Sequence, residues 1–273
     1  ANVNTINTAT SGLVTLSGVT GLTGTAAAVT AAFTANSGAG GVTGLALVEG
    51  STVASGITAT VTDASVAAET LEAIDAQTTG LVTVTGAAIE GNYTDVKAVL
   101  DANAATPATI AGLDAINVTL DNSLTGTANH VATATYTIAN INTIIGLTTG
   151  TVTATATEVE MNTLLTIAES GHNIICNVDT IGTADSYTAA SLITLNALTN
   201  GLITATETHA LSGTATDLVT VLAANTAGEI TGLENNVVTV SGSGSVDAAD
   251  LLAIDAATTG LVTHTATIIN GSY

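Results

Sequence analysis

Internal repetition limits how this chain can fold. The stretch Ala73–Tyr93 recurs as Ala253–Tyr273 without a gap, and both copies contain Ala-Ile-Asp-Ala followed by Thr-Thr-Gly-Leu-Val-Thr. A second ungapped match relates Gly12–Asn36 to Gly201–Asn225. Gly80–Asn103 has the same pattern with one residue fewer. The chain is therefore a repeat protein, and its function has to be inferred from what one repeat can do.

The two halves of the repeat have different hydrophobic periods. Leu81–Thr85 alternates apolar and polar residues and is rich in β-branched side chains, which predicts a strand. The segment before it, Ala67–Ala76, places Leu71 and Ile74 three positions apart, which predicts a helix. We use the word coil for the residues that lead into one such strand, the strand itself and the helix that follows. Equivalent strands are predicted at Leu13–Ser17, Ile57–Val61, Ile116–Leu120, Thr151–Thr155, Asn173–Asn177, Leu202–Thr206, Val237–Ser241 and Leu261–Thr265.

Particular residues mark the ends of the predicted helices. Thr94 is expected to cap the helix over Asp95–Leu100, because its hydroxyl can accept a backbone N–H. Thr-Thr-Gly or Asn-Gly then stops a helix, with a glycine that can take the left-handed conformation after the last turn. The structural positions of the repeat are these glycines, the leucine after three of them, and the asparagine that closes the helical half: Gly80, Gly150, Gly201, Gly260, Leu81, Leu202, Leu261, Asn36, Asn103 and Asn225.

Strands that alternate with short helices at this spacing predict a repeat solenoid. Because consecutive strands are joined through a helix, they should be parallel, with right-handed crossovers. A single coil cannot bury its own apolar face, and stacking of coils closes the core. We therefore expect a right-handed α/β solenoid with a parallel sheet and short helices, as one continuous array of roughly nine irregular coils over residues 1–273. The alternative is an all-β solenoid with the Ala-rich segments as corners, since Thr is a poor helix former.

The composition indicates a thin aliphatic core and an acidic surface. Charged residues are 8% of the chain and aromatic residues 2%, so small and branched aliphatic side chains must fill the interior. Lys97 is the only basic side chain against 22 acids, and the net charge of −21 argues against nucleic acid and anionic membranes, because phosphate contacts need Lys and Arg. No apolar run approaches the ~20 residues that a membrane span requires. Cys176, the single cysteine, is expected to be a small buried side chain.

Catalytic chemistry is not indicated. The imidazole bases are His130, His172, His209 and His264, and His264 stands where the matching repeat has Val84, as expected for a lining or surface residue of a strand. The sequence has no His-x-x-x-His spacing, no Gly-x-Ser-x-Gly and no Walker-type loop. We therefore predict that the protein is not an enzyme and needs no cofactor.

Calcium is the metal that this composition suits best, because carboxylate, amide and hydroxyl oxygens are ligands for a hard cation. The weak candidates are Asp75, Asp255, Asp63 and Asp247. Asp75 and Asp255 occupy the same place in the two copies of the repeat, ahead of the Thr-Thr-Gly stop. No Asp-x-Asp-x-Asp loop or Gly-Gly-x-Gly-x-Asp nonapeptide occurs, so we expect a solvated helix face and only weakly held calcium.

Threonines recur at alternate positions of the predicted strands. Thr83 and Thr85 form one such pair, and Thr263 and Thr265 form another. Stacked coils would align these hydroxyls in an array of the kind that can bind ice or crystalline polysaccharide. We favour the simpler interpretation, in which Thr is a soluble β-former whose hydroxyls face water or bond to neighbouring strands.

Three strings carry a resemblance to a known class of repeats: Ile230-Thr-Gly-Leu-Glu-Asn-Asn-Val-Val-Thr-Val240, Leu252-Ala-Ile-Asp-Ala-Ala-Thr-Thr-Gly260 and Leu211-Ser-Gly-Thr-Ala-Thr-Asp-Leu218. They resemble the tandem repeats of giant secreted or cell-surface proteins of marine cyanobacteria, and similar acidic arrays occur in some phage fibres. The resemblance covers nearly the whole chain. It implies an extracellular structural or adhesive role and carries no catalytic residues.

The repeat stops at Tyr273, the equivalent of Tyr93, ahead of the helix that Tyr93 precedes. We therefore expect a segment of a longer array or an open-ended fibre subunit. The predicted function is to form or stiffen an extracellular fibre, sheath or surface layer by end-to-end stacking with copies of itself. The alternative is an adhesin or phage fibre shaft that binds a cell surface or glycan. Either function places the protein outside the cell or on its surface, without nucleic acid and without membrane insertion.

Overall fold

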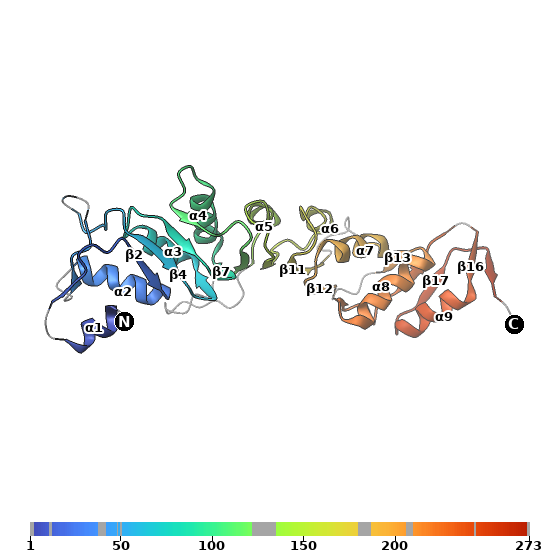
Figure 1. Cartoon of the computed structure of the whole chain (residues 1–273). Helices are drawn as coiled ribbons and strands as arrows, with labels where there is room; N and C mark the ends of the chain where they lie inside the picture. Colours follow the sequence, from blue (N-terminus) through green and yellow to red (C-terminus); the bar gives the residue numbers. More distant parts are fainter. Residues whose placement is uncertain are drawn as a thin grey trace. The chain divides into compact units, whose positions relative to one another are not determined.

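The computed structural model describes residues 3–10, 13–37, 42–47, 49, 51–121, 135–179, 187–205, 210–242 and 244–271. The chain forms two compact units whose boundary falls inside α5 (Ile138–Ile145). Unit 1 comprises residues 1–134 and 143–151, and unit 2 comprises residues 135–142 and 152–273. In both units, successive short helices are separated by one to three short strands (Figure 1).

Unit 1 is a mixed α/β unit whose strands pair in parallel. Strands β2, β4, β6 and β8 form one sheet in that order, β5, β7 and β9 pair in a second, and β1 pairs with β3. Neighbouring helices contact each other, α2 with α3 and α3 with α4. The elements are α1 (Val3–Ala9), β1 (Val14–Thr15), β2 (Gly21–Gly24), α2 (Ala26–Ser37), β3 (Val42–Thr43), β4 (Thr58–Val61), β5 (Ser65–Ala67), α3 (Ala68–Asp75), β6 (Val82–Val84), β7 (Ala88–Gly91), α4 (Tyr93–Ala104), β8 (Ile110–Ala111) and β9 (Asn117–Leu120).

Unit 2 has the same construction. Strands β10, β11, β12 and β14 pair in parallel in that order, as do β13, β15 and β17, and β16 pairs with β18. Helix α8 contacts both α7 and α9. The elements are β10 (Val152–Thr155), α6 (Met161–Leu164), β11 (Asn173–Asn177), α7 (Ala189–Leu198), β12 (Ile203–Thr204), β13 (Leu211–Gly213), α8 (Ala215–Ala227), β14 (Ile230–Thr231), β15 (Val238–Val240), β16 (Ser245–Asp247), α9 (Ala248–Ala257), β17 (Val262–His264) and β18 (Ile268–Asn270).

The core lies between the strands and the helices and is almost entirely aliphatic. In β6 the buried Val82 and Val84 alternate with the half-buried Thr83, and α3 contributes Leu71 and Ile74, which are also buried. This is the burial pattern that a period of two in a strand and a spacing of three in a helix produce. Cys176 is part of this core, and burial raises the pKa of its thiol to about 12, which confirms the prediction of a small buried side chain.

The structure confirms the mixed α/β class and corrects two expectations. Each predicted strand contains an observed one, but the described residues hold nine further short strands that were not predicted, such as β5 and β7. The Ala-rich segments that an all-β fold would use as corners are helices, such as α2 and α8. The all-β alternative is therefore wrong. The predicted cap at Thr94 is also wrong, because α4 begins at Tyr93 and its N-cap is Asn92, whose Oδ1 accepts the Asp95 N–H at 3.1 Å.

Within the described ranges, the structure has no helix that is both long enough and apolar enough to cross a membrane. This agrees with the expectation drawn from the sequence.

Candidate functional site: the threonine–glycine clamp between coils

Buried threonines join neighbouring coils at four places in the described residues. Thr78, Thr148, Thr199 and Thr258 each precede a glycine by two positions and are only 4–8% exposed. Each hydroxyl donates to a backbone carbonyl of the preceding coil, and each accepts the N–H of the glycine that follows. We call this arrangement the Thr-x-Gly clamp. Its members are Thr78–Gly80, Thr148–Gly150, Thr199–Gly201 and Thr258–Gly260.

The carbonyl acceptors occupy the same place in each preceding coil. Thr148 Oγ1 donates to the carbonyl oxygen of Ile116 at 2.7 Å, and Thr258 Oγ1 donates to that of Asn236 at 2.9 Å. The corresponding acceptors for Thr78 and Thr199 are Ile57 and Ile174. A hydroxyl suits this position because it donates and accepts at once, so it satisfies two buried backbone groups that belong to different coils.

The middle residue of the clamp adds a backbone hydrogen bond to the same neighbouring coil. The N–H of Thr149 donates to the Asp114 carbonyl at 2.8 Å, and the N–H of Thr259 donates to the Glu234 carbonyl at 2.7 Å. Asn200 makes the equivalent bond to the His172 carbonyl at 2.8 Å. Each clamp therefore fixes one coil to the next through both side-chain and backbone bonds.

Close approach of two backbones explains the glycine of the clamp. A Cβ added at Gly80, Gly150, Gly201 or Gly260 would fall within 3.0 Å of a carbonyl group of the preceding coil, a separation that real Cβ atoms essentially never show. None of these four glycines has a positive φ, so the expected left-handed stop is wrong for them. A left-handed glycine that does end a helix is Gly228, after α8, with φ of 81°.

The leucines that follow the clamp do not belong to the core. Leu81, Leu202 and Leu261 are 39%, 41% and 68% exposed, whereas the next residues Val82 and Ile203 are buried. The strand begins at that next residue, and its side chains face the core at that residue and at every second residue after it. The leucine is thus a repeated surface residue of the coil.

Asparagines near the helix ends form a second set of bonds. The Oδ1 atoms of Asn36, Asn103 and Asn225 accept the backbone N–H of a leucine at 3.1, 3.1 and 3.2 Å. These leucines, Leu45, Leu113 and Leu233, are buried, and each follows a glycine with a φ between 92° and 98°. The asparagine therefore holds the turn that re-enters the core after the helix.

The candidate calcium ligands are dispersed, and several of them have bonds of their own. Asp63 accepts the N–H of Ala26 at 2.6 Å, so it caps α2 from the next coil. Asp247 accepts the N–H of Ala249 at 3.2 Å as the N-cap of α9, and Asp255 is exposed on α9. Among the described residues, no group of three or more His, Cys, Asp or Glu side chains could hold a metal ion.

Asp75 bonds across coils. It accepts a hydrogen bond from the Thr109 hydroxyl at 3.1 Å, and burial raises the pKa of its carboxyl while this bond works against the rise. The equivalent contact in unit 2 joins Asn196 to Glu229 at 2.9 Å. Asp75 and Asn196 each stand three positions before a clamp threonine, so the contact is another link that the repeat reproduces.

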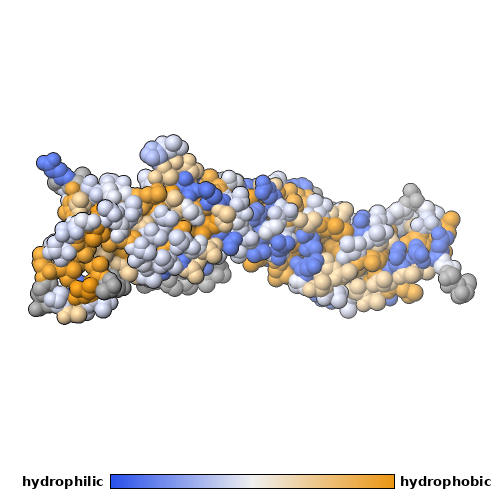
Figure 2. Space-filling model, in the orientation of Figure 1, coloured by the Kyte–Doolittle hydropathy of each residue, from blue (hydrophilic) through white to orange (hydrophobic). Residues whose placement is uncertain are grey.

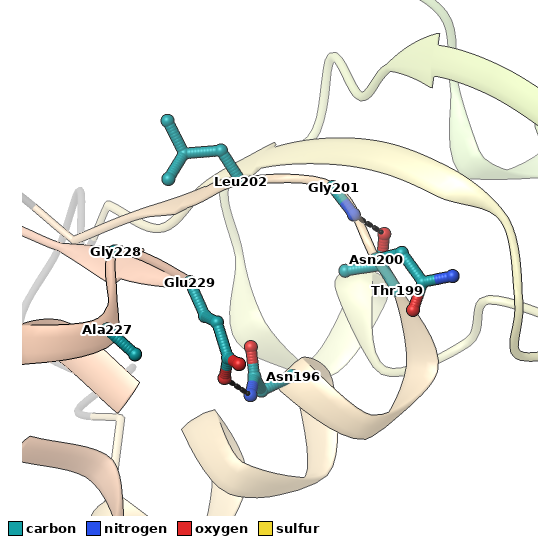
Figure 3. Close-up of a pocket in the computed structure, with 8 residues that line it drawn as sticks. All are labelled: Asn196, Thr199, Asn200, Gly201, Leu202, Ala227, Gly228 and Glu229. Carbon is teal, nitrogen blue, oxygen red and sulfur yellow. Dashed lines mark hydrogen bonds between the residues drawn. The ribbon is translucent and has the colours of Figure 1, made fainter. Parts of the chain in front are cut away.

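A groove of about 450 Å³ lies beside one clamp, between α7 and the turn after α8. Figure 3 shows its lining residues, with the Gly201 N–H bonded to Thr199 Oγ1 and the Asn196 amide bonded to Glu229, while Leu202 points away from these polar groups. Its polar side chains are thus a threonine, two asparagines and one carboxylate. This lining provides hydrogen bonds between coils but no paired nucleophile and base.

The histidines do not meet in the described part of the chain. His130 and His209 lie outside the described residues, and His264 is exposed on β17. His172 is buried, its Nδ1 accepts the Val152 N–H at 3.1 Å, and its carbonyl accepts the Asn200 N–H. It is a structural residue of the clamp region that sequence analysis did not single out for that role.

We expect the buried His172 to make the stability of unit 2 fall at acid pH. Burial lowers the pKa of this imidazole, and the nearby Glu169 carboxylate opposes that effect. Since the pKa is lower in the folded state, the neutral form contributes stability above pH about 6.5 that is lost as the pH falls through the folded pKa. We expect the urea midpoint of the wild type to fall more steeply below this pH than that of His172→Asn, whose amide oxygen can accept the same N–H without titrating. Parallel pH curves for the two proteins would contradict this role.

Threonines are aligned on the strands as expected, and several bond to their neighbours. Thr60 pairs with Thr23 on one side and with Thr83 on the other. The hydroxyls of Thr239 and Thr263 lie 3.1 Å apart, and the Thr85 hydroxyl donates to the Val61 carbonyl at 3.0 Å. These bonds fit the interpretation that the threonine hydroxyls face water or bond to neighbouring strands.

Comparison of the chain with protein-family models, with curated proteins and with solved structures gives no match. The chemistry of the site therefore has to be judged from its own geometry. The recurring clamp joins backbones, and its donors and acceptors are used within the chain.

Proposed function

We propose that this chain is a structural repeat protein, a solenoid of stacked coils that forms or stiffens an extracellular fibre, sheath or surface layer. The observation that carries the proposal is the Thr-x-Gly clamp, which recurs in both units and whose threonine hydroxyls donate to a carbonyl of the preceding coil. A fold stabilised by contacts between neighbouring coils extends by adding coils, without a change in the contacts already made.

The surface chemistry supports an extracellular structural role. One lysine against 22 acids leaves few sites for proteases that cleave after basic residues, and the high negative charge keeps the lateral faces of neighbouring molecules apart. Growth of the assembly is then favoured where parallel strands can add to an open edge.

Electron microscopy of the native protein tests this function. We expect negatively stained preparations to contain polymers that lengthen with protein concentration, and sedimentation to show species heavier than the 26.5 kDa chain. Discrete particles of 26.5 kDa at every concentration would overturn the proposal. If such particles also bound cells or glycans, they would favour an adhesin or phage fibre shaft instead.

A further inference from the structure

The clamp at Thr199–Gly201 differs from the other three in its middle residue. The other clamps read Thr-Thr-Gly, whereas this one reads Thr-Asn-Gly. Elsewhere the middle hydroxyl bonds to the preceding coil, as Thr149 Oγ1 does when it donates to the Asp114 carbonyl at 3.1 Å. Among the described residues, the side chain of Asn200 has no hydrogen-bond partner, and it is exposed beside the groove that Figure 3 shows. This amide is therefore not held by any bond of its own.

An asparagine followed by glycine is the dipeptide whose side chain deamidates most readily, because glycine has no Cβ to obstruct attack by its own nitrogen. The Gly201 nitrogen gives up its proton to hydroxide and attacks Cγ of Asn200. A C–N bond forms, the bond from Cγ to the amide nitrogen breaks, and ammonia leaves with a proton from water. Water then opens the five-membered succinimide at one of its two carbonyl carbons, which yields aspartate or isoaspartate.

The co-reactant of this chemistry is water. Figure 2 shows hydrophilic surface where Figure 1 places α6 and α7, and Asn200 follows α7 on an exposed turn. Access of water is therefore not what limits the reaction at this site.

The clamp withholds the nucleophile instead. The N–H of Gly201 donates to Thr199 Oγ1 at 2.9 Å, so the proton that must leave is held in a hydrogen bond (Figure 3). A Cβ on Gly201 would fall within 3.0 Å of the Ile174 carbonyl, so the backbone has no room to turn. The Asn200 N–H is also fixed, by its bond to the His172 carbonyl at 2.8 Å. The nitrogen can reach Cγ of Asn200 only after these contacts open.

We propose that Asn200–Gly201 is a site of spontaneous deamidation that the clamp keeps closed, and that the reaction makes opening of the clamp permanent. The inference goes beyond the proposed structural function and does not depend on it. Isoaspartate adds one methylene to the backbone, which displaces the Gly201 N–H from Thr199 Oγ1. Either product also places a new carboxylate in the groove that already contains Glu229, and the two like charges repel each other.

The joint that this reaction would loosen has few other bonds between strands. The pairing of β11 with β12 comprises only Cys176 with Ile203 and Asn177 with Thr204. The clamp adds bonds from Thr199 and Asn200 to the same preceding coil. Loss of the clamp therefore removes a large share of the contacts that hold these two coils together.

A second Asn-Gly pair in the chain, Asn270–Gly271, serves as the internal reference. Isoleucine stands there at the position of the clamp threonine, and Asn270 is exposed. The folded protein is incubated at mildly alkaline pH, and deamidation is followed by mass spectrometry of peptic peptides. We expect Asn200 to react at least about tenfold more slowly than Asn270 in the folded protein, and the two rates to converge in guanidinium chloride. Equal rates in the folded protein would overturn the proposal.

Variants of the clamp threonine test whether its hydroxyl controls the rate. We expect Thr199→Val to speed deamidation of Asn200 at least about tenfold in the folded protein, with Asn270 unchanged, and Thr199→Ser to react like the wild type. Thr148→Val is the matched control, because it removes the equivalent hydroxyl from a clamp in unit 1 and should leave the rate at Asn200 unchanged. An unchanged rate at Asn200 in Thr199→Val would show that the clamp does not restrain the reaction.

The wild type alone decides the question if Thr199→Val fails to fold. The opening that frees the Gly201 N–H for attack also frees it for hydrogen exchange. Low concentrations of guanidinium chloride should therefore raise the deamidation rate of Asn200 and the exchange rate of the Gly201 amide, measured by NMR, in parallel. Deamidation that stays constant while exchange accelerates would contradict control by the clamp.

The deamidated protein, separated by ion exchange, tests whether opening becomes permanent. We expect the Gly201 amide of the isoaspartate form to exchange at least about tenfold faster than that of the starting protein. Asn200→Asp carries the new charge without the additional methylene and should show a smaller effect. Asn200→Thr restores Thr-Thr-Gly and should show no mass change in this peptide. Unchanged exchange at Gly201 in the isoaspartate form would show that the clamp survives the reaction and that the second part of the proposal is wrong.

Discussion

Replacing Gly150 by alanine is expected to destabilise unit 1 by about 3 kcal/mol or more, which lowers its thermal midpoint by about 10 °C. The added Cβ would lie within 3.0 Å of the Ile116 carbonyl, and both groups belong to backbone that hydrogen bonds hold in place. Relief requires the two coils to separate, because no flexible side chain can move aside. Calorimetry of the purified variant measures the effect.

Gly24→Ala is the matched control for that experiment. It makes the same chemical change, but its Cβ would meet only the Ala28 Cβ at 3.5 Å, an ordinary van der Waals contact. We expect this variant to unfold within about 0.5 kcal/mol of the wild type. An equal loss of stability in both variants would show that the alanine itself, rather than the close approach of coils, is responsible.

Replacing Thr199 by valine is expected to cost unit 2 about 2 to 4 kcal/mol. Its hydroxyl accepts the N–H groups of Ile174 and Gly201, at 2.8 and 2.9 Å, and donates to the Ile174 carbonyl at 2.8 Å. Valine has nearly the same shape, so packing is kept while these buried backbone groups lose their partner. Chemical denaturation measures the total loss, and amide hydrogen exchange should show faster opening at Ile174 and Gly201.

Two further variants determine whether the hydroxyl is the cause. Thr199→Ser keeps the hydroxyl and should recover most of the lost stability. Thr60→Val makes the same change at a half-buried position of β4 and should stay within about 0.5 kcal/mol of the wild type. If Thr199→Val were as stable as Thr60→Val, the clamp would contribute little to the cohesion of the coils.

Local periodicity is sufficient to predict only part of the secondary structure, since the second strand of many coils, such as β5, β7 and β16, was not predicted and has only three or four residues. The alternation in Leu81–Thr85 and the spacing of Leu71 and Ile74 each describe one face of a single element, so they need no knowledge of its neighbours. The parallel pairing also follows, because a helix between two strands returns the chain in the same direction. The cap of α4 is harder to place, since Asn92 and Thr94 are both good caps and only the observed bond distinguishes them.

The structural importance of the clamp is only partly visible in the sequence. Recurrence of Thr-x-Gly marks Gly80 and Gly150 as structural, but a local rule assigns them a left-handed turn that they do not adopt. Their actual role depends on a carbonyl in the preceding coil, which no local pattern reports. The same holds for Asp63 and Asp75, whose partners Ala26 and Thr109 lie in other coils.

Amino-acid order thus settles those strands and helices whose hydrophobic period is marked, because hydrophobic period and β-branching act within a few residues. It also settles the acidic, aliphatic character of the chain and the places where the repeat recurs. Only the tertiary structure shows why the clamp positions require glycine and why the threonines two residues before them are buried. Both depend on how closely the backbones of two neighbouring coils approach each other.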